Sequence, residues 1–452
     1  MKKLFGTDGV RGEAGKFPLD EATVRAIGSS LTRHLTARKG SAPQIVIGRD
    51  TRESGPWIEG ALTGGAREAG AEIRSAGIIT TPGIAFLART LPADAGVVIS
   101  ASHNPYHDNG IKVFDPSGRK LDDAMERLIE ADIAESGSSR TPQEINSLAP
   151  NGSAELRTRY RDYLAVEVAG DLSLDGMRIV IDCANGASYE IAPDLFARLG
   201  ADVIAINSQP DGKNINRDCG SLHIEALQQR VTAERADLGV AFDGDADRAL
   251  FVDGLGNFID GDVTMWVLAN YLKSRGRLDG DLVVATVMSN IGLEIGLREA
   301  GIDMVRCPVG DKYVMEEMIR RDLSLGGEQS GHVIFSEYLF TGDGLATSLN
   351  VLRTMAATGR TLSDLASELT TYPQVLVNVR VDRKLDLNTV PEVASVIATV
   401  ESRLAGNGRL LIRYSGTEPL LRIMIEGKDQ REIAEWAEEI AEAVRQHLAA
   451  SV

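Results

Sequence analysis

The chain has 452 residues, of which 43% are hydrophobic and 25% are charged. These values are typical of a soluble globular protein, and at roughly 100–200 residues per domain the length predicts three or four domains. The formal net charge of −17 argues against a protein that binds the phosphate backbone of nucleic acid, because both surfaces would be negative.

The N-terminal sequence MKKLFGTDGVRG turns polar too early for a secretory signal, which needs about 7–15 apolar residues. No segment reaches the ~18 apolar residues of a membrane span. The three cysteines lie in no CxxC or Cys/His cluster, so neither a disulfide framework nor a zinc site is indicated. We expect a cytoplasmic protein with no membrane or nucleic-acid partner. Arg11 lies in a glycine-rich sequence that predicts a turn. The turn either binds an anion or has no particular function.

Three stretches repeat one pattern, in which a short apolar run leads through a helix-like segment to a glycine and then to a second strand. A continuous apolar run is typical of a strand covered on both faces, and such a glycine is typical of a helix end. The pattern predicts three parallel strand-helix-strand units. The units begin at 44–50, 178–186 and 282–290, and the glycines are Gly70, Gly200 and Gly301.

Each unit is followed by another apolar or glycine-leading stretch that ends in a polar motif. These stretches are GVVISASHNP, LGVAFDGDADR and LSLGGEQSGH. Ligands of α/β sheets collect at the carboxyl ends of strands. Three related domains are therefore predicted to face one cleft.

The C-terminal section differs from these units. It contains an alternating strand at 375–381, two strands within 409–427 and a helix with apolar residues at helical spacing. This pattern predicts a small α+β domain. We expect α/β domains with mixed sheets at 1–153, 154–254 and 255–370, followed by the α+β domain at 371–452.

The motif DGDADR places Asp243, Asp245 and Asp247 at alternate positions. Alternate residues of an extended segment share a face, so the three carboxylates can converge on one hard cation. An EF-hand is excluded, because Gly254 stands where its loop needs glutamate and Arg248 where it needs glycine. The set suits magnesium or calcium, and a solvated acidic turn is the alternative.

Ser102 in the motif SASHNP follows an apolar strand and precedes Pro105. In isolation such a serine is more often a helix cap or a turn residue, and the GxSxG pattern of a hydrolase nucleophile is missing. His103 is not expected to face the serine, because adjacent side chains seldom face each other. Lys112 follows an Asp-Asn-Gly sequence that is typical of a tight turn, and we interpret it as a base or a surface lysine.

Two further motifs suit the recognition of a small molecule. RYSGTEP combines a guanidinium, two hydroxyls and a glycine turn, which can form an anion-binding concavity; an ordinary hairpin turn is the alternative. GEQSGH offers a carboxylate, a hydroxyl and an imidazole at alternate positions, which suits the binding of hydroxyl groups. A polar turn without a ligand is the alternative. The residues are Arg413, Ser415, Gly416 and Thr417, with Arg422 close by, and Glu328, Ser330 and His332.

Five motifs occur in a specific order: FGTDGVRG, SASHNP, DGDADR, GEQSGH and RYSGTEP. With them the sequence resembles the α-D-phosphohexomutase family across its whole length. The resemblance implies a heart-shaped fold around a central cleft, with three α/β domains and a smaller α+β domain. It also implies an isomerase that moves a phosphoryl group within a phosphosugar.

The same resemblance assigns roles to individual residues. Ser102 carries the phosphoryl group, and the three aspartates bind one magnesium ion per chain together with the Ser102 phosphate. Arg11, Lys112 and His332 fall where the family places groups that transfer protons or neutralise charge. The resemblance further implies substrate-binding residues Arg248, Glu328 and Ser330, and a clamp for the non-reacting phosphate formed by Arg413, Ser415, Gly416, Thr417 and Arg422.

Within the family, GEQSGH and FGTDGVRG most resemble the bacterial phosphoglucosamine mutase branch. Tyr414, Tyr106 and His107 depart from its usual residues without removing a ligand. The branch implies interconversion of glucosamine 6-phosphate and glucosamine 1-phosphate for cell-wall precursor synthesis, through a phosphoserine and a 1,6-bisphosphate that can also prime the enzyme. A phosphomannomutase or phosphoglucomutase, a phosphatase and a silent sugar-phosphate-binding paralogue are the alternatives, and the chain is expected to be a monomer or a homodimer.

Overall fold

The computed structural model describes residues 4–6, 8–136, 153–404, 406, 408–415 and 419–448. Contacts within the chain divide it into two compact units. The first unit comprises residues 1–288 and 301–368, and the second comprises residues 289–300 and 369–452. The described strands form four sheets, of which three belong to the first unit and one belongs to the second.

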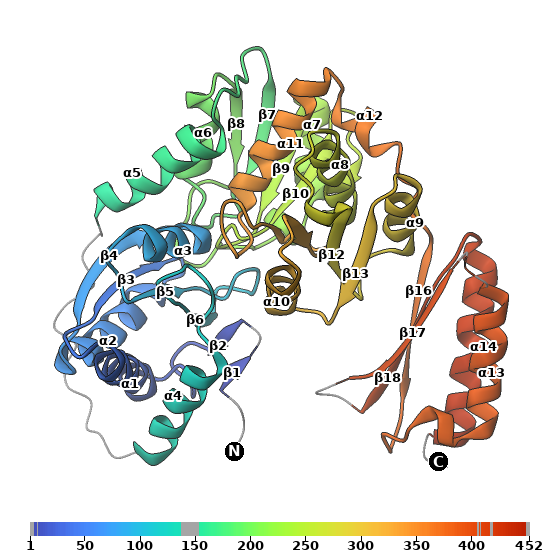
Figure 1. The fold of residues 1–452 in the computed structure, drawn as a ribbon, viewed down its shortest axis with the longest axis horizontal. Helices are drawn as coiled ribbons and strands as arrows, with labels where there is room; N and C mark the ends of the chain where they lie inside the picture. The colour runs from blue at the N-terminus through green and yellow to red at the C-terminus, as the bar shows by residue number, and fades with distance from the viewer. Residues whose placement is uncertain are drawn as a thin grey trace. The chain divides into compact units, whose positions relative to one another are not determined.

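The first sheet has six strands in the order β1-β2-β6-β5-β3-β4. β3 is parallel to β4 and β5, whereas β6 is antiparallel to β5 and β2. Helices α1 and α2 pack together in this domain, which runs from blue to teal in Figure 1. The strands are β1 (Phe5–Gly6), β2 (Gly9–Glu13), β3 (Gln44–Arg49), β4 (Glu72–Ile78), β5 (Ala95–Ile99) and β6 (Asp108–Phe114), and the helices are α1 (Glu21–Lys39), α2 (Gly55–Glu68), α3 (Thr81–Thr90) and α4 (Asp123–Ser136).

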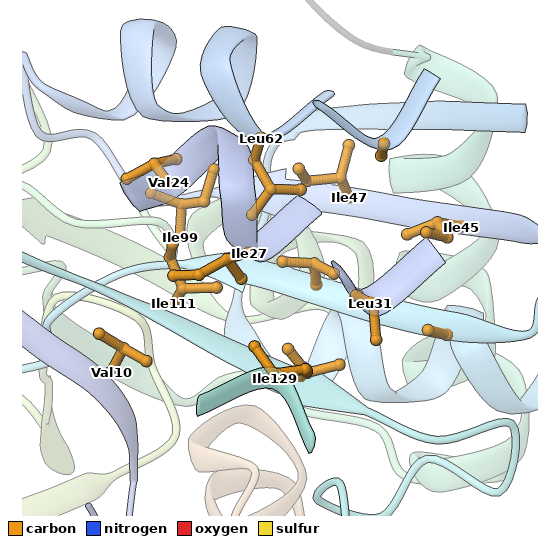
Figure 2. Close-up of a cluster of buried hydrophobic side chains, with 14 of the residues drawn as sticks. Val10, Val24, Ile27, Leu31, Ile45, Ile47, Leu62, Ile99, Ile111 and Ile129 are labelled. Atoms are coloured by element: carbon orange, nitrogen blue, oxygen red, sulfur yellow. The ribbon is translucent and has the colours of Figure 1, made fainter. Parts of the chain in front are cut away.

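Apolar side chains from helices and strands meet in the core of this domain. Figure 2 shows Ile27 and Leu31 of α1 in one cluster with Ile47 of β3 and Ile99 of β5. All four side chains are fully buried, and burial of a large apolar side chain contributes about 1.5–3 kcal/mol. The core therefore fixes β3 and β5, and the loops that follow them start from a rigid base.

The second sheet has the order β11-β10-β9-β7-β8, and the third has the order β13-β12-β14-β15. Their strands are β7 (Arg178–Asp182), β8 (Asp202–Ile206), β9 (Leu238–Phe242), β10 (Ala249–Asp253), β11 (Phe258–Ile259), β12 (Leu282–Thr286), β13 (Asp303–Cys307), β14 (Leu325–Gly327) and β15 (Val333–Phe335). The helices are α5 (Ala154–Tyr163), α6 (Ile191–Arg198), α7 (Glu225–Glu234), α8 (Gly261–Ser274), α10 (Asp311–Arg321), α11 (Gly344–Thr358) and α12 (Leu362–Ala366), with short helical turns η1 (Leu164–Val168), η2 (Gly220–Leu222) and η3 (Asp279–Asp281).

The three sheets share one arrangement, which confirms the predicted repeat. The first strand of each unit (β3, β7 or β12) lies between two parallel partners. The later partner (β5, β9 or β14) also pairs with an antiparallel strand (β6, β10 or β15). Every residue of β5 and β9 is buried, as a continuous apolar run predicts. Each polar motif follows this later partner, so the motifs occupy equivalent places.

The first strand of each unit also ends in the same kind of turn. The side chain of Asp50, Asp182 or Thr286 accepts a hydrogen bond from the backbone N–H two residues later, at 3.0, 2.9 and 3.2 Å. Short polar side chains favour such turns because they offer the backbone an alternative partner. The repeat thus includes side chains as well as topology.

The Asp-Asn-Gly sequence before Lys112 is not a turn, so that prediction is wrong. Asp108, Asn109 and Gly110 begin β6 and pair with β2. A Cβ atom at Gly110 would lie 2.5 Å from the carbonyl oxygen of Ser100. The glycine therefore permits a close approach of two backbones, and its φ is not in the left-handed region.

The second unit contains an antiparallel sheet in the order β16-β18-β17, on which α13 and α14 pack. Ile433, Ile440 and Val444 of α14 are buried at helical spacing, and Trp436 packs against the same core. This confirms the predicted α+β domain, whereas the exact domain boundaries stay predictions. The elements of the unit are α9 (Ile291–Glu299), β16 (Gln374–Arg380), η4 (Leu387–Thr389), α13 (Pro391–Leu404), β17 (Arg409–Tyr414), β18 (Leu420–Glu426) and α14 (Gln430–Leu448).

Candidate active site

Ser102 lies in the loop that follows β5, and its side chain is buried. Its φ of 54° is in the left-handed region that serine seldom adopts. The hydroxyl donates a hydrogen bond of 2.5 Å to Oδ2 of Asp243, which lies 141 positions away in the sequence. Two motifs from equivalent strand ends thus meet in the structure.

His103 contacts the same hydroxyl, contrary to the expectation for adjacent side chains. Its Nδ1 lies 3.2 Å from Ser102 Oγ. The serine proton is donated to Asp243, so Nδ1 must be the donor in this contact. Burial, followed by the charges of Arg248 and Arg11, lowers the pKa of His103 to about 4. The imidazole is therefore neutral at neutral pH.

The acidic motif forms the loop between β9 and β10. Asp243, Asp245 and Asp247 are buried, and one carboxylate oxygen from each lies within 4.8 Å of the others. The alternative of a solvated turn is therefore wrong. Burial, then the charges of Asp247 and Asp245, raise the pKa of Asp243 well above its usual value. Carboxylates crowded in this way need a counter-charge.

The acidic loop offers ligand atoms that suit a hard divalent cation. Among the residues that the structure describes, Oδ1 of Asp245 and Oδ1 of Asp247 are buried with no hydrogen-bond partner. Buried carboxylate oxygens are normally paired, so these two atoms fit the role of ligands. Magnesium prefers oxygen ligands, and a small protein set leaves positions for a phosphate group.

Lys112 on β6 supplies positive charge beside the acidic loop. Its Nζ lies 2.9 Å from Asp245 Oδ2, 3.2 Å from Asp247 Oδ2 and 3.0 Å from Asp8 Oδ2. The residue is 2% exposed, so its interpretation as a surface lysine is wrong. Burial acts to lower the pKa of Lys112, but the three carboxylates outweigh burial and raise it well above its usual value. The side chain is therefore an ammonium ion.

A chain of ion pairs that the sequence analysis missed continues from this lysine. Asp8 pairs with Arg11 and Lys112, and also with Lys120 at 2.6 Å. Lys120 pairs in turn with Asp311, the first residue of α10, at 2.6 Å. Asp8 and Asp311 are separated from Lys120 by 112 and 191 positions. No local pattern could therefore have indicated this link between the first and third α/β domains.

A cavity of about 410 Å³ lies beside the acidic loop. Arg11 and Arg248 line it, and the Nε atom of each is buried without a hydrogen-bond partner in the described part of the chain. Guanidinium groups bind phosphate and carboxylate oxygens strongly because the bonds are assisted by charge. This wall of the cavity suits an anionic ligand.

Glu328 and His332 bring the GEQSGH motif to the same cavity. Oε1 of Glu328 accepts a hydrogen bond of 3.1 Å from the backbone N–H of Gly310. Ser330 lies in the same loop between β14 and β15 and is half-buried. This bond uses only one of the two carboxylate oxygens of Glu328. The other oxygen, Oε2, is suited to accept a hydrogen bond from a hydroxyl group in the cavity.

His332 lies between Asp247 and the backbone of Gly342. Its Nδ1 is 3.7 Å from Asp247 Oδ1, and its Nε2 accepts a hydrogen bond of 2.9 Å from the Gly342 N–H. Burial acts to lower the pKa of His332, but Asp247 and then Asp311 raise it to about 9. A charged ring cannot accept the Gly342 bond, so this contact belongs to the neutral ring with its proton on Nδ1. The raised pKa favours the charged ring at neutral pH, and charging His332 therefore breaks the Gly342 bond.

The residues of RYSGTEP belong to the second unit. Arg413 on β17 and Arg422 on β18 are direct partners in the register of the two strands. Ser415 is buried directly after β17. Two arginines at one level of a sheet suit an anion, which is compatible with the predicted clamp. Two of its predicted members lie outside the described residues: Gly416 and Thr417.

Sequence profiles of the phosphoglucomutase/phosphomannomutase family match four successive parts of the chain. Alpha/beta/alpha domains I, II and III match residues 2–140, 158–256 and 260–372, and the C-terminal domain matches residues 376–443. The chain belongs to this family. The predicted membership is confirmed, and the protein is a mutase, that is, an isomerase.

Relatives of this mutase match it over almost their whole length. The phosphoglucosamine mutase of Solibacter usitatus is 51% identical over 447 residues, which cover 99% of both chains. That of Syntrophotalea carbinolica is 48% identical over 455 residues, which cover 99% of this chain and 98% of the relative. A family protein of Burkholderia thailandensis, 24% identical, has the same fold, with a TM-score of 0.80 over 99% of this chain and 98% of the other. No helix in the described ranges has the length and apolar character of a membrane span.

Proposed function

We propose that this mutase interconverts glucosamine 6-phosphate and glucosamine 1-phosphate through phosphorylated Ser102 and a 1,6-bisphosphate. The observation that carries the proposal is the 2.5 Å contact between the Ser102 hydroxyl and Asp243, inside a buried acidic triplet that fits a cation. The names of relatives that are 47–51% identical support the amino sugar as substrate.

In the first half-reaction, the phosphoryl group passes from Ser102 to the C1 hydroxyl of glucosamine 6-phosphate. The bond between phosphorus and Ser102 Oγ breaks, and a bond between phosphorus and the C1 oxygen forms. A proton leaves the sugar hydroxyl through a base of the site, and one proton returns to Ser102 Oγ. The products are the 1,6-bisphosphate and a serine in the hydroxyl form, the form that donates to Asp243.

In the second half-reaction, the bisphosphate presents its other end. Ser102 Oγ gives its proton to a base of the site and attacks the phosphorus of the C6 phosphate. The bond from phosphorus to the C6 oxygen breaks, and that oxygen takes up a proton. Glucosamine 1-phosphate leaves, and Ser102 is phosphorylated again. Burial of Ser102 at 1% exposure supports a mutase over a phosphatase, because water has little access to the phosphoryl group.

Four cationic or proton-carrying side chains serve these steps. Phosphoryl transfer depends mainly on positioning and on neutralising charge that spreads over the transferred group. We assign the neutralising role to Arg11 and Arg248, which line the cavity. Proton transfer falls to Lys112 and His332, which lie against Asp245 and Asp247, and general acid–base catalysis of this kind contributes ~10²–10⁴-fold.

Asp243, Asp245 and Asp247, together with the Ser102 phosphate, would hold one magnesium ion. When bound, the ion supplies positive charge that stabilises the transferred group. A hexose or hexosamine 1,6-bisphosphate is proposed as the primer that first phosphorylates Ser102.

The remaining site residues recognise the substrate. Glu328 and Ser330 are proposed to bind sugar hydroxyls, and the clamp of Arg413, Ser415, Gly416, Thr417 and Arg422 is proposed to hold the phosphate that does not react. The sugar turns between half-reactions, so a clamp that recognises only phosphate serves both orientations. Intracellular sugar phosphates as substrates support a cytoplasmic location.

The test compares phosphoryl transfer and sugar preference. Wild-type protein and Ser102→Ala are incubated with magnesium and glucosamine 1,6-bisphosphate, and intact mass is measured. We expect one added phosphoryl group on the wild type only, and a kcat/KM for glucosamine 6-phosphate at least about tenfold above those for glucose 6-phosphate and mannose 6-phosphate. A phosphorylated Ala variant rejects the phosphoserine, a reversed preference assigns another sugar, and steady release of inorganic phosphate indicates a phosphatase.

A further inference from the structure

Arg52 lies beneath the loop that carries Ser102, and its side chain has no exposed surface. A guanidinium has five N–H donors in a rigid planar fork. In this structure the donors face five oxygen atoms, of which three are backbone carbonyls of the serine loop and a fourth is the carbonyl of Asp108 at the start of β6. The acceptors are Asp50 Oδ2 (2.8 Å) and the carbonyls of Ser102 (2.9 Å), Asn104 (2.8 Å), Pro105 and Asp108 (3.0 Å).

A second chain of hydrogen bonds holds Arg52 and the serine to the same anchor. Asp50 accepts from Arg52 Nε and also from the Ser100 hydroxyl, at 2.7 Å. The Ser100 hydroxyl in turn accepts from the backbone N–H of Ser102 at 2.9 Å. Asp50 directly follows β3. The hydrogen bonds through Asp50 therefore anchor the serine to the core of the domain.

Asn216 reaches the loop from the second α/β domain. Its Nδ2 donates to the carbonyl oxygens of Ser102 and Asn104, at 2.8 and 3.1 Å. These are the two carbonyls that Arg52 Nη2 already binds. The acidic loop passes close by, because a Cβ at Gly244 would lie 2.5 Å from the Ser102 carbonyl and 2.9 Å from Asn216 Nδ2.

The backbone of Ser102 needs such restraint. A left-handed conformation costs a residue with a Cβ roughly 1–2 kcal/mol, and strained backbone persists only where the surroundings fix it. The carbonyl of the strained residue is held from one side by Arg52 and from another by Asn216. Both side chains bind the Ser102 carbonyl, whereas the hydroxyl bonds to His103 and Asp243, so their influence on the hydroxyl passes through the backbone.

We propose that Arg52 and Asn216 are positioning residues that fix the left-handed backbone of Ser102 and thereby aim its hydroxyl at Asp243. The inference rests on the proposed function, in which Ser102 carries the phosphoryl group. A displacement of about 1 Å from the reactive geometry can lower a rate by 10²-fold. The two residues therefore control the rate of transfer more than the binding of substrate.

Arg52→Lys tests the first half of the proposal. Lysine keeps the charge but has three donors, so it leaves carbonyls of the loop without partners. We expect kcat and the rate of Ser102 phosphorylation by glucosamine 1,6-bisphosphate to fall by about a hundredfold, with KM changed less than about threefold. Arg49→Lys is the matched control, because Arg49 is also buried but pairs with Glu59 at 2.8 Å and does not touch the loop.

Asn216→Ala tests the second half from another domain, which keeps the inference testable if Arg52→Lys fails to fold. We expect kcat to fall at least about tenfold with little change in KM, since one of two restraints remains. Asn214→Ala is its control, because Asn214 bonds to Gln209 and Asp211 of its own loop. Melting temperatures of all four variants separate loss of fold from loss of positioning.

The outcomes distinguish the inference from the function on which it depends. If the wild type gains no phosphoryl group at Ser102, the proposed function is rejected and the inference falls with it. If the wild type is phosphorylated but Arg52→Lys and Asn216→Ala transfer as fast as their controls, the inference alone is overturned. A loss that appears in KM rather than kcat also overturns it.

Discussion

Asp343 and the acidic loop illustrate two ways to place carboxylates inside this mutase. Asp343 precedes α11 and is fully hydrogen-bonded: Oδ1 accepts from the N–H groups of Leu345 and Ala346, both at 3.0 Å, and Oδ2 accepts from the Tyr160 hydroxyl at 2.7 Å. In the acidic loop, by contrast, Asp245 and Asp247 each keep one buried oxygen with no hydrogen-bond partner within the described ranges.

The difference separates a structural carboxylate from functional ones. Asp343 caps a helix, where N–H groups and the helix dipole favour negative charge. In the acidic loop, Lys112 is instead shared between Asp245 and Asp247, and each of these aspartates keeps one buried oxygen without a hydrogen-bond partner in the described part of the chain. Incomplete pairing of this kind destabilises a fold and is retained where a site needs it.

Lys112→Met should give the largest effect. The substitution removes the proposed proton carrier and the counter-charge of the carboxylates together, so we expect kcat to fall ~10²–10⁴-fold in steady-state assays with glucosamine 6-phosphate. Lys120→Met is the control, because Lys120 pairs with Asp8 and Asp311 rather than with the acidic loop. A variant at position 112 that keeps more than a tenth of wild-type kcat would contradict the assigned role.

Asp243→Asn should lower activity yet stabilise the metal-free protein. Its raised pKa shows that the charged form is disfavoured by burial and by Asp247 and Asp245, so a neutral amide relieves repulsion at neutral pH. We expect activity to fall at least about a hundredfold and the melting temperature without magnesium to rise. Magnesium should then raise the melting temperature of the wild type but not that of the variant; a less stable metal-free variant would refute the comparison.

Asp343→Asn should give the smallest effect, confined to stability. Burial raises the pKa of Asp343 to about 6 from a usual value of 3.8, so its contribution is present at low pH and is lost as pH rises through about 6. Between pH 5 and 7 the wild type should lose about 1 kcal/mol relative to the variant. Thermal unfolding across this range measures the difference, and parallel curves for the two proteins would show that Asp343 does not titrate there.

The sequence was sufficient to predict the repeat and the meeting of its motifs. Apolar runs define the strands, and the carboxyl ends of the strands carry the chemistry, so Ser102 and Asp243 could be expected near each other. The burial of Lys112 and its charged state among three carboxylates needed the structure, because one residue on a strand carries no signal of burial. The turn predicted from Asp-Asn-Gly was wrong for a similar reason. The pairing of β6 with β2 outweighs the preference of these three residues for a turn.

Contacts between domains that involve residues outside the motifs, or pairs of specific atoms, lay beyond sequence reasoning. Thr81 donates to Asp245 Oδ2 at 2.5 Å across 164 positions, and Lys120 joins Asp8 to Asp311. Such pairs follow from how domains pack, which no periodicity encodes. The left-handed φ of Ser102 could not be predicted either, because glycine and asparagine are the residues that usually indicate this region, and serine is not one of them.

The complete pairing of Arg52 limits which length changes the serine loop can accept. All five donors are engaged by Asp50 and by carbonyls between Ser102 and Asp108, so an inserted or deleted residue in that interval would move at least one oxygen out of reach. The geometry thus gives the segment a fixed residue count. Insertions in functional variants of this chain should occur elsewhere, and a library of loop lengths at 102–108 should yield active enzyme only at the native length.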